Sequence, residues 1–343
     1  MKGMWTTMDS SMKPKKEKFL SKKKLIDNLL VMLGIIIFIS IFSKFFGEDN
    51  TLVGVTIITA ALMFSAMDVS IKFKDAIASI IIVFTIMGVT SYVSMLNAFI
   101  GIPLNFISVY LITYIFSNKV ENKAYLPFML CYVFMQGNPI LGLNQFLIRI
   151  GALFIGSIIV ALVYYFTHKK SKDDDKRSIK EMFTTEFHAN KIQANFALRM
   201  AIGITISMFI GSYFGFQKGM WISATVLSLT QPYYEQTKER IPERIFGTII
   251  GAIAFVIIFY FIVPKSLESM AVLIISYVYM FVKPYKYQMI FVTLNALSAA
   301  MILFNFTVSI PMRIAFMLVG VVIAIIVNKS MRHIKEKIDK NEI

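Results

Sequence analysis

The stretch FGFQKGMWISATVLSLTQPYYEQTKERIPERIFGTIIG, residues 214–251, decides the architecture of this chain. A polar tip at Gln217 and Lys218 leads into a short apolar run, which ends at Gln231 and a proline. A charged loop follows, and a glycine-spaced apolar segment then begins near Ile245. Apolar runs joined by short polar and charged loops are typical of helices that cross a membrane in succession.

The same plan occurs earlier in the chain. Phe46 and the glycine after it recur 168 residues later as Phe214 and its following glycine. Arg149 recurs 164 residues later as Arg313, each followed by an isoleucine and, seven residues on, by a glycine. Two offsets this similar indicate one duplicated unit, so we expect two similar halves.

Composition sets the fold class. The chain has 343 residues, of which 57% are hydrophobic and 16% are charged, against about 25% charged in soluble proteins. Its apolar runs approach the roughly 20 residues that a helix needs to cross a bilayer. Lipid-exposed backbone must satisfy its own hydrogen bonds, and a β-barrel would show alternation instead of continuous runs. The chain is therefore predicted to be an all-α, polytopic membrane protein.

Twelve apolar segments are predicted, six in each half, as two six-helix repeats that point the same way. The fifth, eighth and tenth are short for a crossing, so they either span fully or re-enter. The twelve segments are Leu25–Phe45, Thr51–Met67, Ala76–Ala98, Ile102–Ser117, Ala124–Met135, Gln145–Phe166, Phe196–Tyr213, Met220–Gln231, Ile245–Val263, Ser269–Val282, Tyr287–Phe304 and Pro311–Val327.

The cations predict the orientation. Most of the 35 Lys and Arg residues fall in the two tails and in alternate loops. The positive-inside rule then places both termini in the cytoplasm and requires an even number of helices, with the cell membrane as the location. The net charge of +15 is explained by these segments, and no nucleic-acid-binding module accompanies it.

Five regions follow from this plan. Residues 1–24 form a cytoplasmic polybasic tail that would lie against anionic inner-leaflet lipid. Residues 25–167 form the first six-helix repeat, and 168–195 a solvated cytoplasmic linker with one short interfacial helix near residues 179–187. Residues 196–328 form the second repeat, and 329–343 a basic cytoplasmic tail.

The sequence contains none of the common catalytic motifs that would indicate an enzyme. There is no Walker A loop, and no G-x-S-x-G, H-E-x-x-H or C-x-x-C spacing. No pair of carboxylates lies within an apolar helix, and the single cysteine, Cys131, permits no disulfide framework. We therefore expect no catalytic residues, no cofactor and no metal, and transport remains as the function.

The eighth segment is the candidate substrate site. Short or proline-broken segments at matching places in two halves are the best sequence pointer to a transporter site. This segment carries indole, hydroxyl and amide groups within a membrane helix, at Trp221, Thr225, Ser228 and Gln231. Such groups either contact the substrate or have only a structural role. In the structural role the tryptophan lies at the outer membrane interface and the hydroxyls bond neighbouring helices. The glycines at Gly247 and Gly251 are assigned to close helix packing.

Three arginines are the candidate anion contacts. Counted from the inner ends of their helices, Arg149 and Arg313 lie about 25 and 21 Å up, near the outer boundary. They either snorkel outward as anchors or form a ring of positive charge that selects anions. Arg244, placed at the cytoplasmic start of the ninth segment, either supplies the inner end of the same path or is an anchor.

A family resemblance rests on Gly219 to Thr225, on the Gln231-Pro232 pair and on the run from Arg240 to Gly251. Over about residues 199–264 the chain resembles the fusaric acid resistance (FUSC-type) membrane module, which is shared with the aromatic acid exporter family. The resemblance implies efflux of aromatic or other organic carboxylates driven by the proton gradient. It also implies that Arg244 and the arginines of the sixth helix of each unit contact the anion. We expect this chain to differ from the larger exporters in having no sizeable cytoplasmic domain between or after its halves.

Two other functions are compatible with these features. A passive anion channel would use the same arginines without a coupling site, and the lack of a buried carboxylate favours it. A non-transporting membrane scaffold in envelope assembly is the third possibility. The expected partners are a small organic anion, the lipid bilayer and possible further copies of the chain, with no nucleic acid.

Overall fold

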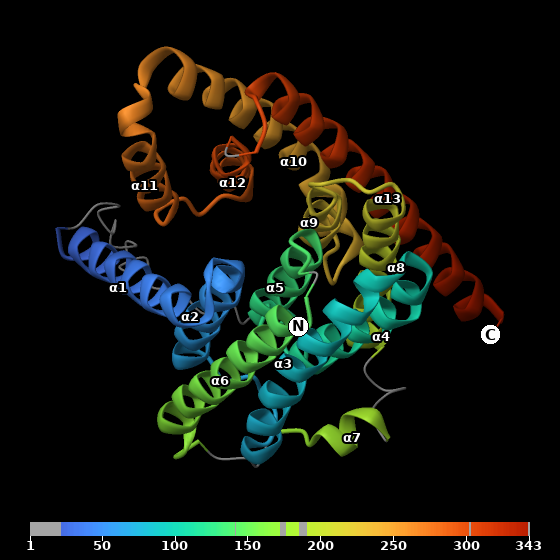
Figure 1. Ribbon diagram of the computed structural model, residues 1–343. Coiled ribbons are helices and arrows are strands. Elements are labelled where there is room, and N and C mark those ends of the chain that lie inside the picture. The colour runs from blue at the N-terminus through green and yellow to red at the C-terminus, as the bar shows by residue number, and fades with distance from the viewer. Residues whose placement is uncertain (1–21, 141, 172–175, 185–190, 302, 342–343) are drawn as a thin grey trace, which may run out of the picture.

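The computed structural model describes residues 22–140, 142–171, 176–184, 191–301 and 303–341. Most of the predicted polybasic tail lies outside these ranges, as do the side chains of residue 191 and of residues 334–341. The described chain is helical, and an isolated bridge between Ile71 and Arg177 is its one β-type pairing. The helices, arranged as in Figure 1, are α1 Lys22–Phe46, α2 Thr51–Ala66, α3 Phe73–Leu96, α4 Ala98–Phe116, α5 Leu126–Gly137, α6 Leu143–His168, α7 Ile179–Phe183, α8 Lys191–Tyr213, α9 Met220–Leu229, α10 Tyr234–Val256, the π-helix η3 Ile257–Ile262, α11 Glu268–Tyr279, α12 Tyr285–Ala300 and α13 Phe306–Asn341.

Each of the twelve predicted apolar segments coincides with a helix. Eight helices in the described ranges are long and apolar enough to cross a membrane: α1, α2, α3, α4, α6, α8, α10 with η3, and α13. The multi-pass, all-helical class is therefore confirmed, whereas the count of twelve crossings is not. The remaining four, α5, α9, α11 and α12, have 12, 10, 12 and 16 residues. At 1.5 Å per residue they are shorter than the roughly 30 Å hydrocarbon core.

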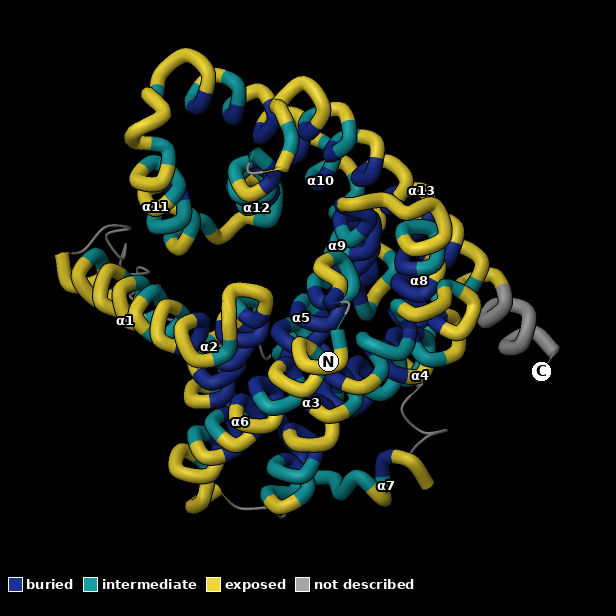
Figure 2. The backbone as a smooth tube through the Cα atoms, viewed as in Figure 1, coloured by how far each residue is buried: buried dark blue, intermediate teal, exposed yellow. Residues whose placement is uncertain are grey.

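The short helices α5 and α9 meet at the centre of the molecule (Figure 1). A proline near its first turn starts α5, and α9 ends shortly before Pro232, which disfavours helix in the residue preceding it. Both helices are largely buried, in contrast with the exposed α1 (Figure 2). Longer helices therefore enclose α5 and α9, and the side chains of these two short helices face the interior of the molecule.

The packing pairs of the first half recur in the second. α1 packs on α2 as α8 packs on α9, and α2 and α3 pack on α6 as α9 and α10 pack on α13. α3 packs on α5 as α10 packs on α12. Two pairs differ: α3 packs extensively on α4 and α2 packs on α5, while neither α10 and α11 nor α9 and α12 have a comparable contact. The two halves meet mainly where α4 packs on α8.

The sequence predicts a solvated linker between the halves, but in the structure part of this linker packs against the helix bundle. Its short helix α7 docks on the end of the bundle where residues 68–75 lie. The backbone N–H of Lys72 donates to the carbonyl of Arg177 at 2.8 Å, and the Tyr114 hydroxyl donates to the carbonyl of Met182 at 2.6 Å. Met182 is only 1% exposed. The apolar face of α7 thus packs against the bundle. We call this end of the molecule the linker end.

An ion pair between Asp68 and Lys176 holds the linker against the bundle. The Lys176 ammonium donates to the Asp68 carboxylate at 2.7 Å, and the Ser70 backbone N–H donates to the same group at 2.7 Å. Burial by itself raises the pKa of Asp68, but these donors outweigh it and hold the pKa below its ordinary value. The carboxylate therefore stays ionised, and keeps the ion pair, at neutral pH.

Gly247 and Gly251 pack against α12, in agreement with the packing role predicted for them. A Cβ at Gly251 would lie 2.7 Å from the carbonyl oxygen of Ile290, whereas Gly34 on α1 has open space around it. Gly251→Leu is expected to force α10 away from α12 and to destabilise the protein by about 3 kcal/mol or more. Gly34→Leu is the matched control. The melting temperature of the two purified variants checks this, and equal values would contradict the packing assignment.

Candidate functional site

A central cavity of about 1160 Å³ lies between the first-half helices α2 and α5 and the second-half helices α9, α10, α12 and α13. It reaches from Lys123 and Arg240 near the linker end to Asp49 and Lys218 near the opposite end. That opposite end, with residues 47–50 and 214–219, is called the hairpin end. The charged residues that line the cavity are the cations Lys123, Arg149, Lys218, Arg240, Arg244 and Arg313 and the acids Glu48 and Asp49.

Six of the seven predicted site residues line this cavity: Arg149, Trp221, Ser228, Gln231, Arg244 and Arg313. The seventh, Thr225, lies behind the wall, where its hydroxyl donates to the carbonyl of Trp221 at 2.9 Å. Residues from both halves are thus brought around one space. Their role in binding a substrate stays a prediction.

Arg313 is a buried cation without a counter-charge. It lies seven residues into α13, about 10 Å from the start of that helix, and only 2% of it is exposed. Its guanidinium carbon stands 4.9 Å from the ring centroid of Trp221, and its Nε has no hydrogen-bond partner. Within the described chain no carboxylate pairs with it. A cation–π contact is worth about 0.5–2 kcal/mol, which is far less than burying a charge costs.

Arg244 is a second cation that its surroundings compensate poorly. α10 begins at Tyr234, so Arg244 lies ten residues into the helix and not at its start. Its Nη2 donates to the Thr225 hydroxyl at 3.2 Å, its Nη1 contacts the Met289 sulfur, and its Nε has no partner. A thioether is a weak acceptor. The predicted position was wrong because the polar residues 234–243 continue the helix instead of forming a loop.

Arg149 is held differently from its counterpart Arg313. Its Nε donates to the side-chain oxygen of Asn50 at 3.1 Å, and its Nη2 donates to the Asp49 carbonyl at 2.8 Å. A third bond, 3.4 Å long, reaches the carbonyl of Asn138. Arg149 therefore joins α6 to the hairpin-end residues before α2 and after α5. Both Arg149 and Arg313 are 2% exposed, so neither snorkels outward as an anchor.

The linker end of the cavity has its own cation and aromatic pair. The Arg240 guanidinium lies 4.5 Å from the ring centroid of Tyr285 and donates to the carbonyl of Ser228 at 3.1 Å. The Ser228 hydroxyl contacts the Tyr285 hydroxyl at 3.1 Å, and the Gln231 amide donates to the Ser228 carbonyl at 3.1 Å. These contacts hold Ser228 and Gln231 in the cavity wall.

Three lining cations were missed by the sequence reasoning: Lys123, Lys218 and Arg240. One signal could have found Arg240, because residues four apart on a helix share a face and Arg244 is its neighbour on that face. Lys123 and Lys218 lie in loops. Burial lowers the pKa of Lys218, and burial together with the nearby charge of Arg240 lowers the pKa of Lys123. Nothing in the sequence indicates that these loops fold inward.

The arrangement is suited to an anion. Guanidinium groups bind carboxylates through paired, charge-assisted hydrogen bonds, and Arg313 and Arg244 have donors that the protein leaves unused. Three aromatic side chains line the cavity with these arginines: Trp221, Tyr279 and Tyr285. Within the described ranges no group of three or more His, Cys, Asp or Glu side chains could hold a metal ion.

Comparison with known proteins identifies part of the chain. Residues 206–327 match the model of a family described as fusaric acid resistance protein-like. The match takes in α9 to α12, the last turns of α8 and most of α13. The predicted resemblance is thereby confirmed over the second half, which carries Trp221, Arg244 and Arg313.

Two relatives match part of the chain. The chain is 31% identical over 103 residues to an uncharacterized protein of Haemophilus influenzae. It is 27% identical over 131 residues to an uncharacterized protein, ORF2, of Neisseria gonorrhoeae. These matches take in 29% and 37% of this chain but only 14% and 31% of the two relatives. The matched part thus spans less than a third of either relative. No solved structure matches the chain.

Proposed function

We propose, from the premise that residues 206–327 form a fusaric acid resistance protein-like membrane module, that this protein exports organic carboxylate anions through the central cavity. Aromatic carboxylates would be the preferred substrates, and the proton gradient would drive them. The observation that carries the proposal is Arg313, a fully buried guanidinium in the cavity wall that has an aromatic partner but no acid. An anionic solute would supply the missing charge.

The cavity dimensions and walls support a planar anion. Its volume of about 1160 Å³ slightly exceeds the 300–1,000 Å³ of common ligand sites. A carboxylate placed between Arg313 and Arg244 would lie beside two guanidinium groups that the protein compensates poorly, and an attached ring would lie against Trp221 or Tyr279. Arg240 and Tyr285, near the linker end, form a second point of attraction along the same path.

The recurring order and packing of the helices support two parallel repeats, residues 25–167 and 196–328, as the framework of this path. On this proposal the linker end lies in the cytoplasm with both termini, and the protein resides in the cell membrane. The cation-rich segments at that end favour this orientation. A homo-oligomer and contact of the polybasic tail with anionic lipid belong to the same proposal.

A passive anion channel is the second candidate. Proton coupling commonly uses a titrating group at membrane depth, and the carboxylates that line the cavity, Glu48 and Asp49, both lie near the hairpin end. This placement favours a pathway that conducts anions without coupling.

Flux into proteoliposomes separates these functions. With benzoate and acetate as probes, we expect benzoate flux to saturate, to exceed acetate flux, and to rise several-fold when a pH gradient is imposed. Flux that ignores the pH gradient but carries current would establish the channel instead. The absence of flux for every carboxylate tested, from protein shown to be folded, would leave only the scaffold and end the transport proposal.

A further inference from the structure

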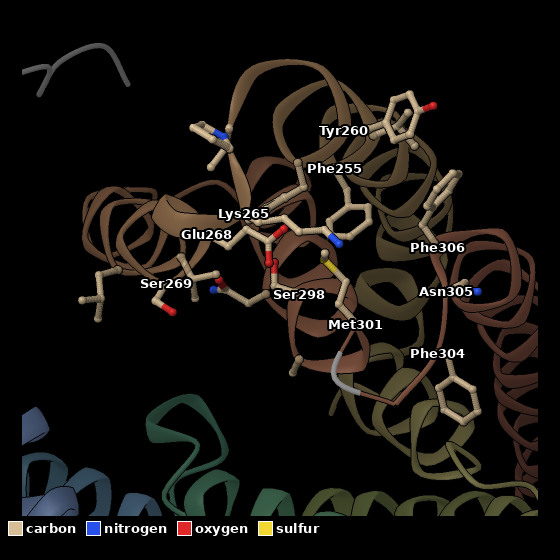
Figure 3. A pocket seen from close by; sticks show the side chains of 18 residues that line it. Phe255, Tyr260, Lys265, Glu268, Ser269, Ser298, Met301, Phe304, Asn305 and Phe306 are labelled. Atoms are coloured by element: carbon tan, nitrogen blue, oxygen red, sulfur yellow. The ribbon is translucent and has the colours of Figure 1, made fainter.

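A second cavity, of about 1150 Å³, lies within the second half of the chain (Figure 3). Residues of α10, η3, α11 and α12 and of the turn before α13 line it. Helix α12 separates it from the central cavity, because Asn295 and Ala299 border both. Apart from this wall, the second cavity shares no residue with the candidate anion site.

This cavity exists because α10 and α11 stand apart. In the first half, α3 packs closely on α4, but the equivalent helices of the second half have no such contact. Helix α11 buries a single side chain, Ile275, among its residues. The space left between the helices has largely apolar walls, among them Phe255, Phe259, Val272 and Leu273. An apolar space of this size inside a bilayer requires an apolar filling.

Two opposite charges reach into this apolar space. Figure 3 shows the side chains of Lys265 and Glu268 extending into the cavity, toward Ser298 and Met301. Within the described ranges, neither side chain makes a hydrogen bond or an ion pair with the protein. Lys265 is exposed and Glu268 is half-buried, so a ligand seated here would meet both an ammonium and a carboxylate beside apolar walls.

The charges lie at the level expected for lipid head groups. Tyr234–Ile262 spans 29 residues, or about 43 Å of helix, which exceeds the roughly 30 Å hydrocarbon core. Lys265 lies three residues after the end of this segment. Phe255 lies seven residues before its end, about 10 Å deeper, and Leu273 lies about 8 Å beyond Glu268 along α11. The polar groups are thus at the boundary and the apolar walls below it.

The surface around the cavity is apolar. Tyr260, Phe261, Leu267 and Met270 are all exposed apolar or aromatic side chains on the elements that form it. Aromatic residues at this level are typical of the membrane interface. A molecule would therefore reach the cavity from the lipid phase.

From these features we propose that the second cavity binds a zwitterionic phospholipid with a primary ammonium in its head group, namely phosphatidylethanolamine. The phosphate pairs with the Lys265 ammonium, and the lipid ammonium donates to the Glu268 carboxylate. Acyl chain occupies the space between α10 and α11 that packing of the protein leaves open. The lipid completes the second half where direct contact between α10 and α11 is missing.

Lipid retention tests the proposal. The protein is purified in detergent from membranes and equilibrated with equal amounts of phosphatidylethanolamine, phosphatidylcholine and phosphatidylglycerol, and retained lipid is counted by native mass spectrometry. We expect phosphatidylethanolamine to be retained about tenfold over the other two, because only it offers both a phosphate and N–H donors. Equal retention of phosphatidylcholine, preference for phosphatidylglycerol, or no retained lipid would each overturn the proposal.

Variants locate the site. Lys265→Ala and Glu268→Gln are each expected to lower phosphatidylethanolamine retention about tenfold, and Val272→Trp, which fills the apolar part, should displace the lipid. Lys44→Ala, at an exposed lysine at the end of α1, is the matched control and should retain lipid normally. Full retention in Lys265→Ala, Glu268→Gln and Val272→Trp would refute the assignment to this cavity. Because retention is measured without transport, its outcome is independent of the proposed export.

Discussion

Arg313→Met is expected to lower the apparent affinity of carboxylate flux by about 10- to 100-fold while leaving the melting temperature unchanged or higher. A charge-assisted hydrogen bond contributes about 1.5–3 kcal/mol, and the Nε of Arg313 has no partner in the protein. The protein itself gives this guanidinium little beyond the face of Trp221. Removing a buried charge that has no partner also removes its desolvation cost, so the fold should not suffer.

Arg313→Lys separates charge from geometry. Lysine keeps the positive charge but loses the planar fork that pairs with a carboxylate. We expect an intermediate loss of flux, and Lys44→Met, at an exposed position, should behave as the wild type. If Arg313→Met transports normally, or if it fails to fold, the assignment of Arg313 to substrate binding is contradicted.

Arg149→Met is expected to do the opposite, destabilising the protein by about 3–5 kcal/mol while changing substrate affinity little. The guanidinium of Arg149 donates to Asn50, to the Asp49 carbonyl and to the Asn138 carbonyl. Without it, the buried side-chain oxygen of Asn50 loses its partner, at about 1–3 kcal/mol, and the partly buried carbonyls of Asp49 and Asn138 lose theirs, at about 0.5–1.5 kcal/mol each. The melting temperature and the yield of monodisperse protein measure the effect.

Asn50→Ala is the matched control for this second prediction. It removes one acceptor of Arg149 and also the bond from the Asn50 amide to the Phe46 carbonyl, so a smaller loss of about 1–2 kcal/mol is expected. A stable Arg149→Met protein that has lost flux would show that Arg149 contacts the anion and does not fasten the hairpin end.

The contrast between these two arginines shows where prediction from sequence stops. Their positions in the repeat are equivalent, and both were correctly expected in helices. The two arginines differ in the groups that their guanidiniums contact. Arg149 contacts residues about 100 positions away in the chain, and Arg313 contacts the indole of Trp221. Contacts of that range leave no local pattern in the chain.

Helix positions were predicted well because long apolar runs have few alternatives in a membrane. Helix ends were predicted less well where polar residues continue a helix, as in residues 234–243 of α10. The short lengths of α5 and α9 were expected, but the cavity itself could not be foreseen, because it depends on these two helices meeting at the centre. Lys123 and Lys218 were missed for the same reason, since loop residues line the cavity only once the helices are placed.

The most direct test of the central claim is anomalous diffraction from crystals of the protein soaked with a brominated benzoate. The account predicts a bromine peak in the central cavity near the rings of Trp221 or Tyr279, with the carboxylate within hydrogen-bond distance of Arg313 or Arg244. The peak should vanish in Arg313→Met. A peak outside this cavity, or an equal peak in that variant, would contradict the claim that these guanidinium groups bind the transported anion.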